Sequence, residues 1–235
     1  MVGRFAAGCL LGAWLRSAEG RCAAFGAVVP QMREGAVVLA GGRSSRMGPS
    51  KALLDWHGLT AVAHAVEVVR EGVAGGSVCV VRSLGQELPA LDAIVVDDAV
   101  AHRGPLGGLH AGLAALAGQV EVVFACGVDT PLLAPAFVRR VCGSLRDGDD
   151  AVVPVIDGRA QPLLAAYRTV VAPQLQALLD RGAFGLKDIS GTCAVRELSE
   201  HELLADAELA VADPRLRSAA NANTQEEWAA LVAEG

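Results

Sequence analysis

Short runs of β-branched and other apolar residues alternate with longer amphipathic segments from Ala36 onward, and this alternation limits the folds open to the chain. Residues 36–40 (AVVLA) are apolar throughout, as expected of a strand buried on both faces of a sheet. Residues 60–72 place valines at steps of three or four, which predicts a helix with one apolar face. These patterns recur and predict an α/β fold in which helices cover a mostly parallel, mixed sheet. Further strands are predicted at 78–81, 94–96 and 122–126, and further helices at 106–116 and 135–145.

The second half of the chain is less regular but contains no linker, internal repeat or low-complexity tract. Residues 32–235 are therefore predicted to form one domain. Residues 1–31 do not fit the pattern and are interpreted as an N-terminal extension, either flexible or preceding a true start at Met32; an accessory segment and an export signal are the alternatives. In the second half of the chain, the predicted elements are strands at 151–155 and 163–167 around an Asp157–Gly158–Arg159 turn, a helix at 173–179, strands near 193–198 and 218–222, and a closing helix at 225–233.

The charge balance excludes several classes of partner. Twenty Lys and Arg residues against 26 Asp and Glu give a net charge of −6, which removes the general attraction that a nucleic-acid-binding protein needs. No stretch approaches the roughly 18 apolar residues of a membrane span, so we expect a soluble, cytoplasmic protein. The six cysteines have neither a Cys-x-x-Cys pair nor a zinc-like spacing with histidine, and are interpreted as buried small residues in a reducing compartment.

The segment that follows the first strand has the composition of a phosphate-binding loop. It reads LAGGRSSRMGPSK from Leu39 to Lys51, and its glycines let consecutive backbone N–H groups face an anion. Arg46 and Lys51 add positive charge to this segment. Its spacing matches neither the P-loop nor the Gly-x-Gly-x-x-Gly of dinucleotide-binding folds. Only two of the 20 basic residues are lysines, which draws attention to Lys51.

Acidic residues stand where predicted strands end, which is where ligands of open parallel sheets bind. Asp97 and Asp98 directly follow the strand at 94–96, and Asp129 comes shortly after the strand at 122–126. Carboxylates in these places can hold Mg²⁺ against a triphosphate, because Mg²⁺ takes one or two protein carboxylates together with phosphate oxygens and waters. The alternatives are a capping role for Asp129 and solvated turn positions for the acidic pair.

Three further segments are candidates for ligand contact. The glycines of residues 104–108 (GPLGG) let the backbone approach a ligand, or simply begin a helix. Polar groups stand in apolar surroundings in two segments, Gln161–Pro162 with Tyr167 and residues 221–224 (NANT). The alternative for the second segment is that Asn223 or Thr224 caps the closing helix. The five histidines are scattered, and no Gly-x-Ser-x-Gly or His-Glu-x-x-His motif is found, so a serine hydrolase or zinc protease is not indicated.

Taken together, these residues resemble the molybdenum cofactor guanylyltransferase family, within the wider group of MobA-like nucleotidyltransferases. The resemblance runs from about residue 36 to residue 231. The family's first motif, Leu-Ala-Gly-Gly-x-Ser-x-Arg-Met-Gly followed by Lys, is matched throughout residues 39–51, and the segments at 104–108, 129–131, 161–167 and 221–224 agree in order and spacing. The resemblance implies a three-layer Rossmann-like fold. It also implies transfer of GMP from Mg²⁺-GTP to the terminal phosphate of the molybdenum–molybdopterin cofactor, with release of pyrophosphate.

The resemblance also assigns roles to residues and partners. Its partners would be GTP and the molybdopterin cofactor, with transient contacts to cofactor insertion proteins and molybdoenzymes, and with neither nucleic acid nor membrane. Asp129 would hold the Mg²⁺ ion. The implied catalytic residues are Lys51, Asp129 and Arg46; the implied nucleotide-binding residues are Leu39, Ala40, Gly41, Gly42, Lys51, Asp98 and Asp129; and the implied pterin-side residues are Gln161, Pro162, Tyr167, Asn221 and Asn223.

The chain departs from the family pattern at two positions. Arg82 stands at the end of a predicted strand where the family often has an Asn tied to guanine recognition, and Gln225 replaces the Pro that usually follows Asn-x-Asn-Thr. Gly41 favours guanine, because related cytidylyltransferases tend to have Ala there. The alternatives are a related enzyme that uses CTP or another acceptor phosphate, and a catalytically silent nucleotide-binding protein.

Overall fold

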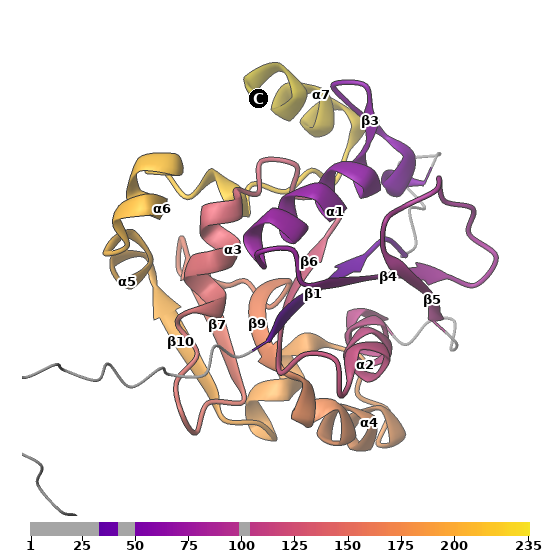
Figure 1. Ribbon diagram of the computed structural model, residues 1–235, viewed down its shortest axis with the longest axis vertical. Helices are drawn as coiled ribbons and strands as arrows, with labels where there is room; N and C mark the ends of the chain where they lie inside the picture. The colour runs from indigo at the N-terminus through magenta and orange to yellow at the C-terminus, as the bar shows by residue number, and fades with distance from the viewer. Residues whose placement is uncertain (1–32, 42–49, 99–103) are drawn as a thin grey trace, which may run out of the picture. The chain divides into compact units, whose positions relative to one another are not determined.

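A mixed eight-stranded β-sheet lies at the centre of the computed structural model, which describes residues 33–41, 50–98 and 104–235 (Figure 1). Neighbouring strands follow the order β10-β7-β9-β6-β1-β4-β5, and β8 pairs with β7. β9 runs antiparallel to both of its neighbours, whereas β1 is parallel to β4 and β6. The strands are β1 (Glu34–Leu39), β4 (Ser77–Ser83), β5 (Ile94–Asp98), β6 (Val122–Gly127), β7 (Ala151–Ile156), β8 (Arg159–Ala160), β9 (Leu164–Arg168) and β10 (Val195–Ser199).

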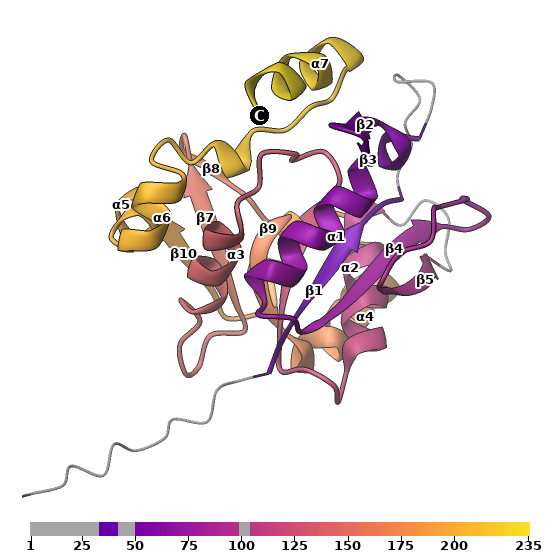
Figure 2. The same ribbon diagram turned by 45° about the horizontal axis from the view of Figure 1, so that its top comes forward.

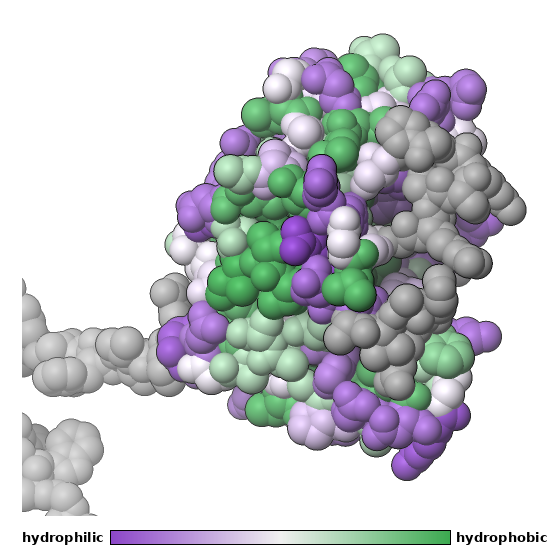
Figure 3. Space-filling view, turned by 90° about the vertical axis from the view of Figure 1, so that its right-hand side faces the viewer, coloured by the Kyte–Doolittle hydropathy of each residue, from purple (hydrophilic) through white to green (hydrophobic). Residues whose placement is uncertain are grey.

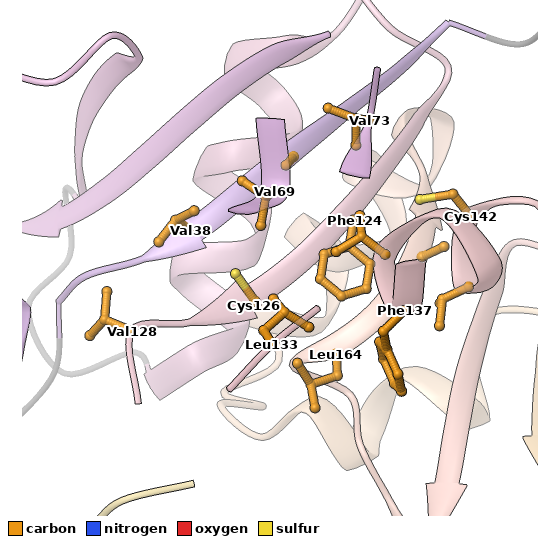
Figure 4. Packing of buried hydrophobic residues seen from close by; sticks show 14 of the residues in the cluster. Val38, Val69, Val73, Phe124, Cys126, Val128, Leu133, Phe137, Cys142 and Leu164 are labelled. Atoms are coloured by element: carbon orange, nitrogen blue, oxygen red, sulfur yellow. The ribbon is translucent and has the colours of Figure 1, made fainter. Parts of the chain in front are cut away.

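Helices cover both faces of this sheet and complete three layers (Figure 2). Successive side chains of a strand point to opposite faces, so Val38 of β1 packs in one core and Val37 in the other. The first core lies under α1 (Ala61–Gly72) and α3 (Pro135–Cys142), where Val38, Val69, Phe124 and Phe137 converge (Figure 4). The second lies under α2 (Gly104–Leu116) and α4 (Ala172–Asp180). The expected three-layer α/β fold is confirmed.

Helix α2 approaches β1 closely because glycines face the strand. A Cβ atom added at Gly112 would lie 2.5 Å from both Cγ atoms of the buried Val37. A Cβ atom added at Gly108 would lie 3.1 Å from the tip of the Leu39 side chain. These glycines therefore bring the first turns of α2 against the end of β1.

The parallel strands end together at one edge of the sheet. Leu39 at the end of β1 is in register with Val81 of β4 and with Gly127 of β6, and β5 continues the parallel set beyond β4. The segments that leave these strands therefore meet at one place.

Strand β5 forms the outer edge of the sheet on this side. Its Ile94 and Val95 side chains are 39% and 40% exposed, and Leu84, just after β4, is 73% exposed. Figure 3 views the protein from that side and shows apolar residues gathered beside polar ones. The β5 edge therefore exposes apolar side chains as well as polar ones.

Most predicted elements agree with the structure to within a few residues, but the strand predicted near residues 218–222 is wrong. Residues 217–219 form a 3₁₀ turn, in which the Asp213 carboxylate accepts from the backbone N–H of Arg217 at 2.7 Å and of Ser218 at 2.8 Å. Leu216 adopts φ 51°, in the left-handed region, which turns the chain just before these residues. The side chain of Asp213 thus supplies the hydrogen bonds that a neighbouring strand would otherwise make.

Several short elements were not predicted. They include the two-residue strands β2 (Asp55–Trp56) and β3 (Leu59–Thr60), joined by a His57–Gly58 turn with φ values of 48° and 90°. The closing helix is confirmed as α7 (Gln225–Glu234) and begins with a capping box between Thr224 and Glu227. The other unpredicted elements are α5 (Glu200–Leu204), α6 (Ala207–Ala212) and 3₁₀ turns at Lys51–Leu53, Thr169–Val171 and Leu186–Gly191.

Four sequence predictions fall wholly or partly on residues outside the described ranges: the N-terminal extension at 1–31, the phosphate-binding loop at 39–51, of which 42–49 are outside, and the roles of Gly42 and Arg46. The extension, and the single domain predicted for 32–235, stay predictions. Within the described ranges, none of the helices has the length and apolar character needed to cross a bilayer.

Candidate active site

A pocket of about 700 Å³ lies where the parallel strands end. It is lined by residues that leave β1, β4, β5 and β6 and by the first turns of α2. Six of the seven expected nucleotide-binding residues line it, and the seventh, Gly42, lies outside the described ranges. The six are Leu39, Ala40, Gly41, Lys51, Asp98 and Asp129. The volume falls within the range typical of small-molecule sites.

Lys51 joins three segments that are distant in the sequence. Its Nζ donates to the backbone oxygen of Ala222 at 2.9 Å and to Oδ1 of Asn223 at 3.3 Å, and it lies 3.7 Å from Oδ2 of Asp129. The Lys51 and Asp129 side chains are 22% and 31% exposed, so both charges remain accessible from the pocket. A cation and a carboxylate held side by side provide a place for a metal–phosphate ligand.

Asp129 is positioned by the turn that follows β6. Its Oδ1 occupies the space that a Cβ atom at Gly127 would need, so the side chain folds back over a glycine that lines the same pocket. The backbone oxygen of Asp129 accepts from the N–H of Ala222 at 2.8 Å. The carboxylate thus faces the pocket on a backbone fixed from two sides.

The donor set fits a Mg²⁺ ion that arrives with a nucleotide. Asp98 and Asp129 both line the pocket. Nowhere in the described ranges do three or more His, Cys, Asp or Glu residues form a group that could hold a metal. One or two carboxylates, with phosphate oxygens and waters completing the shell, is the arrangement that Mg²⁺ prefers at phosphate-transfer sites.

The acidic pair at the end of β5 divides between two environments. Asp98 lines the pocket, whereas Asp97 accepts a hydrogen bond from Nε of Arg82 at 2.8 Å. Both are the last residues of β5 and do not follow the strand as predicted. Arg82 is absent from the pocket lining, while Val81 and Ser83 line it, because alternate residues of β4 face opposite sides of the sheet.

The glycine-rich segment at 104–108 lies within α2, whose described residues begin at Gly104, and not before the helix as predicted. Gly104, Pro105 and Gly108 line the pocket. A Cβ atom at Gly104 would lie 2.6 Å from the backbone oxygen of Phe184, and Gly104 has φ 62°. The glycines here serve close packing as well as any approach to a ligand.

The residues expected on the pterin side lie in two places. Gln161 and Pro162 are half-buried beside Leu163, which lines the pocket, and Asn221 and Asn223 are exposed in the segment that Lys51 contacts.

Tyr167, the fifth of these residues, is 1% exposed and belongs to the core beneath α2 and α4. Burial raises the pKa of its phenol, and its hydroxyl donates to the Pro162 oxygen at 2.7 Å. Tyr167 therefore holds the Gln161–Pro162 turn in place and is not itself presented to a ligand.

An aromatic cluster fixes the segment that carries Asn221 and Asn223. Trp228 of α7 lies 5.8 Å from Trp56, ring centre to ring centre, and its Nε1 donates to the Asp55 oxygen at 2.8 Å. The ring of His64 stacks on Trp56 at 5.2 Å, and its Nε2 donates to the Pro131 oxygen at 2.8 Å. Burial lowers the pKa of His64. The cluster therefore ties α1 and α7 to the turn that carries Asp129.

Sequence reasoning missed several residues of the pocket. Ser50, Ser83 and Leu84 line it, as do Val128 and Leu163. Ser50, Val128 and Leu163 are next to predicted site residues, and Ser83 and Leu84 come two and three residues after the strand predicted at 78–81, so position relative to the strand ends was the available signal.

Comparison with known proteins places this arrangement in a family. The family model described as "MobA-like NTP transferase domain" matches residues 36–198. A probable molybdenum cofactor guanylyltransferase of Bacillus cereus strain AH820 is 30% identical over 195 residues, which cover 82% of this chain and 92% of the relative.

Two solved structures share the fold. Molybdopterin-guanine dinucleotide biosynthesis protein A from Archaeoglobus fulgidus superposes with a TM-score of 0.66 at 21% identity, covering 85% of this chain and 97% of that one. A Mycobacterium tuberculosis protein solved in complex with manganese gives a TM-score of 0.51 at 23% identity, covering 72% and 88%. With a family model that spans most of the described fold, the chain belongs to the MobA-like nucleotidyltransferases.

Proposed function

We propose that the protein transfers GMP from Mg²⁺-GTP to the terminal phosphate of the molybdenum–molybdopterin cofactor and releases pyrophosphate. The observation that carries this proposal is that Lys51 and Asp129 line one pocket while Asn223 lies within hydrogen-bond distance of Lys51, so that segments which the family resemblance assigns to nucleotide, metal and pterin converge on one amine. The probable guanylyltransferases among the relatives support the same activity. We place the reaction in the cytoplasm, with molybdoenzymes and their cofactor insertion proteins receiving the product.

The reaction needs charge neutralisation more than proton transfer. A phosphate monoester has a second pKa of about 6, so the acceptor is already an anionic nucleophile at neutral pH. In agreement, the residues that line the pocket in the described ranges include neither histidine nor cysteine. The protein's tasks are to reduce repulsion between two anions, align the attack on the α-phosphorus and stabilise the departing pyrophosphate.

The residues of the pocket divide these tasks. Lys51 would donate from Nζ to phosphate oxygens and so neutralise charge that grows on the leaving group. Asp129 would hold a Mg²⁺ ion, which would supply positive charge that polarises phosphate oxygens, and Asp98, which lines the same pocket at the end of β5, would contact the nucleotide. Asn223, already within hydrogen-bond distance of Lys51 at 3.3 Å, would bring the acceptor to the same cation.

Arg82, which stands where the family often has Asn, does not line the pocket, and its Nε donates to Asp97 at 2.8 Å. The proposal of guanine therefore rests on Gly41 and on the relatives, and not on this position. Gly41 lies so close to β4 that a Cβ atom there would come within 2.8 Å of the Ser83 backbone nitrogen. A methyl group at this position would require the ends of β1 and β4 to separate, so this chain is built around the Gly that the guanylyltransferase pattern has here.

The test compares nucleotides and then carboxylates. Purified protein is incubated with Mg²⁺, molybdenum–molybdopterin cofactor and each of GTP, CTP, ATP and UTP, and both nucleotide affinity and pyrophosphate release are measured. We expect release with GTP. Release with CTP but not GTP would overturn the assignment to guanine, and tight GTP binding without release would indicate the catalytically silent alternative.

Asp129→Ala tests the metal assignment, with Asp97→Ala as the matched control. Both remove a carboxylate from the same edge of the sheet, but only Asp129 lines the pocket. We expect Asp129→Ala to lower turnover about 100-fold or more, the size of effect seen when one charge-stabilising group is removed from a transition state. Asp97→Ala should remain within about twofold of the unmodified protein. Near-normal turnover in Asp129→Ala would refute the metal assignment.

A further inference from the structure

Gln86, in the loop between β4 and β5, makes three hydrogen bonds with its half-buried side chain. Its Oε1 accepts from the backbone N–H of Ser83 at 3.0 Å. Its Nε2 donates to the backbone oxygen of Ala40 at 3.0 Å and to Oγ of Ser50 at 2.9 Å. One amide thus contacts the end of β4 and both sides of the glycine-rich segment.

The chemistry of the partners fixes how this amide is oriented. The Ser83 N–H can only donate and the Ala40 carbonyl can only accept, so the oxygen must face Ser83 and the nitrogen must face Ala40. Both N–H bonds of the amide are used, on Ala40 and Ser50. A carboxylate of the same shape still accepts from the Ser83 N–H and can accept from the Ser50 hydroxyl, but it has no proton for the Ala40 carbonyl oxygen and repels it.

Ala40 and Ser50 lie near the two ends of the glycine-rich segment at 39–51. Ala40 is the second residue of this segment and Ser50 is the last before Lys51, and both line the pocket. The Ser50 backbone oxygen accepts from the Leu53 N–H at 2.9 Å, which begins the 3₁₀ turn that carries Lys51. The position of Ser50 therefore sets where the backbone of Lys51 starts.

We propose that Gln86 is a positioning residue for nucleotidyl transfer, a role that rests on the proposed function only in requiring a nucleotide in this pocket. By holding Ala40 and Ser50 on one amide, it fixes the separation between the first strand and Lys51. Gln86 is absent from the pocket lining, so it acts through these two residues and not on the nucleotide. Ser83 at the end of β4 holds the Gln86 amide, so the rigid sheet fixes the distance between Ala40 and Ser50.

Gln86→Glu tests the proposal, with Gln119→Glu as the matched control. Gln119 also donates from Nε2 to a backbone oxygen, that of Ala115 at 3.0 Å, but at the far end of α2. Both variants add one negative charge and remove one amide. We expect Gln86→Glu at pH 7.5 to lose about 10- to 100-fold in kcat/KM for GTP, the range produced when a reacting group is displaced by up to 1 Å. Gln119→Glu should stay within about twofold.

Acidification separates the hydrogen bond from a general structural defect. When the carboxyl group introduced by Gln86→Glu is protonated, it regains one donor while its other oxygen still accepts from Ser83. A glutamate with the ordinary pKa of about 4.3 is about 6% protonated at pH 5.5, so the ratio of Gln86→Glu to unmodified activity should rise from pH 7.5 to 5.5 by about 1.5-fold for a tenfold deficit and by about sevenfold for a 100-fold deficit. Thermal unfolding followed by circular dichroism checks that the variant is folded at both pH values. A Gln86→Glu protein within twofold of normal at pH 7.5, or a deficit that does not change with pH, would overturn the proposal.

Binding without acceptor keeps this test independent of the proposed function. The dissociation constant of the nucleotide preferred by the unmodified protein is measured with Mg²⁺ for the same three proteins. We expect weaker binding by Gln86→Glu at pH 7.5 and partial recovery at pH 5.5, where about 6% of a carboxyl with the ordinary pKa is protonated. If the unmodified protein binds nucleotide but transfers nothing to the cofactor, the proposed function fails, and the binding measurements still decide the proposal about Gln86. Equal nucleotide binding by all three proteins overturns the proposal about Gln86.

Discussion

The contact between Gly112 of α2 and Val37 of β1 gives a quantitative prediction about the scaffold of the site. In Gly112→Ala the new methyl would lie 2.5 Å from both Cγ atoms of Val37 and 3.1 Å from its Cβ. Favourable carbon–carbon contacts require about 3.5–4.0 Å, so helix and strand must separate by about 1 Å. Val37 is fully buried and β-branched, and its stiff side chain cannot turn away.

The expected change follows from two opposing contributions. Overpacking of this kind costs about 2–3 kcal/mol, and replacing a helical Gly by Ala recovers about 1 kcal/mol of helix propensity. We therefore expect Gly112→Ala to lower the free energy of unfolding by about 1–2 kcal/mol. Gly108→Ala is the control in the same helix, because its methyl would meet only the flexible tip of Leu39, at 3.1 Å. That variant should be neutral or more stable by up to about 1 kcal/mol.

Urea unfolding, followed by far-UV circular dichroism, measures both variants. Val37→Ala removes the two methyl groups that clash, so the double variant Val37→Ala/Gly112→Ala should show a favourable coupling of about 1 kcal/mol or more relative to the sum of the single changes. If Gly112→Ala and Gly108→Ala are equally stable, or if the coupling is zero, the close approach of α2 to β1 is not what limits this position.

Two further predictions concern Lys51 and His64. Lys51→Met should lower turnover about 100-fold or more and stability by only about 1 kcal/mol, because the Lys51 and Asp129 side chains are 22% and 31% exposed and water can replace their contacts. Lys187→Met, which changes the chain's other, exposed lysine, should leave pyrophosphate release unchanged, and an equal loss in both variants would refute the assignment. Burial lowers the pKa of His64, so as pH falls below about 6.5 the unfolded chain takes up a proton that the folded protein resists. Urea midpoints should therefore show stability lost on acidification by the unmodified protein but less by His64→Gln; parallel pH profiles would contradict this.

The order of elements around the site was predictable because it depends on local pattern. Buried parallel strands are continuous apolar runs, so residues 36–40 and 122–126 were recognisable without knowledge of the fold. Once those strands were placed, the glycine-rich segment, Lys51 and Asp129 had to lie at their carboxyl ends. The location of the pocket therefore followed from the sequence.

What could not be predicted depends on contacts between distant segments. The strand expected at 218–222 was lost because the carboxylate of Asp213 captures two backbone N–H groups there, a choice that composition does not reveal. Arg82 could be placed off the pocket only after the facing of β4 was known. No sequence pattern marked Gln86 as a site residue. Its role depends on hydrogen bonds to Ser83 nearby and to Ala40 and Ser50 in a distant part of the chain.

The contact between Lys51 and Ala222 spans 171 residues of sequence, and this has a consequence for how the protein becomes active during synthesis. Domains begin to fold while the ribosome is still adding residues. The strands β1, β4 and β6 can pair before the C-terminal segment emerges, but Lys51 then has neither Ala222 nor Asn223 to hold its amine. Because contacts of long sequence separation form late, we expect Lys51 to gain its contacts with Ala222 and Asn223 only after the strands that line the pocket have paired.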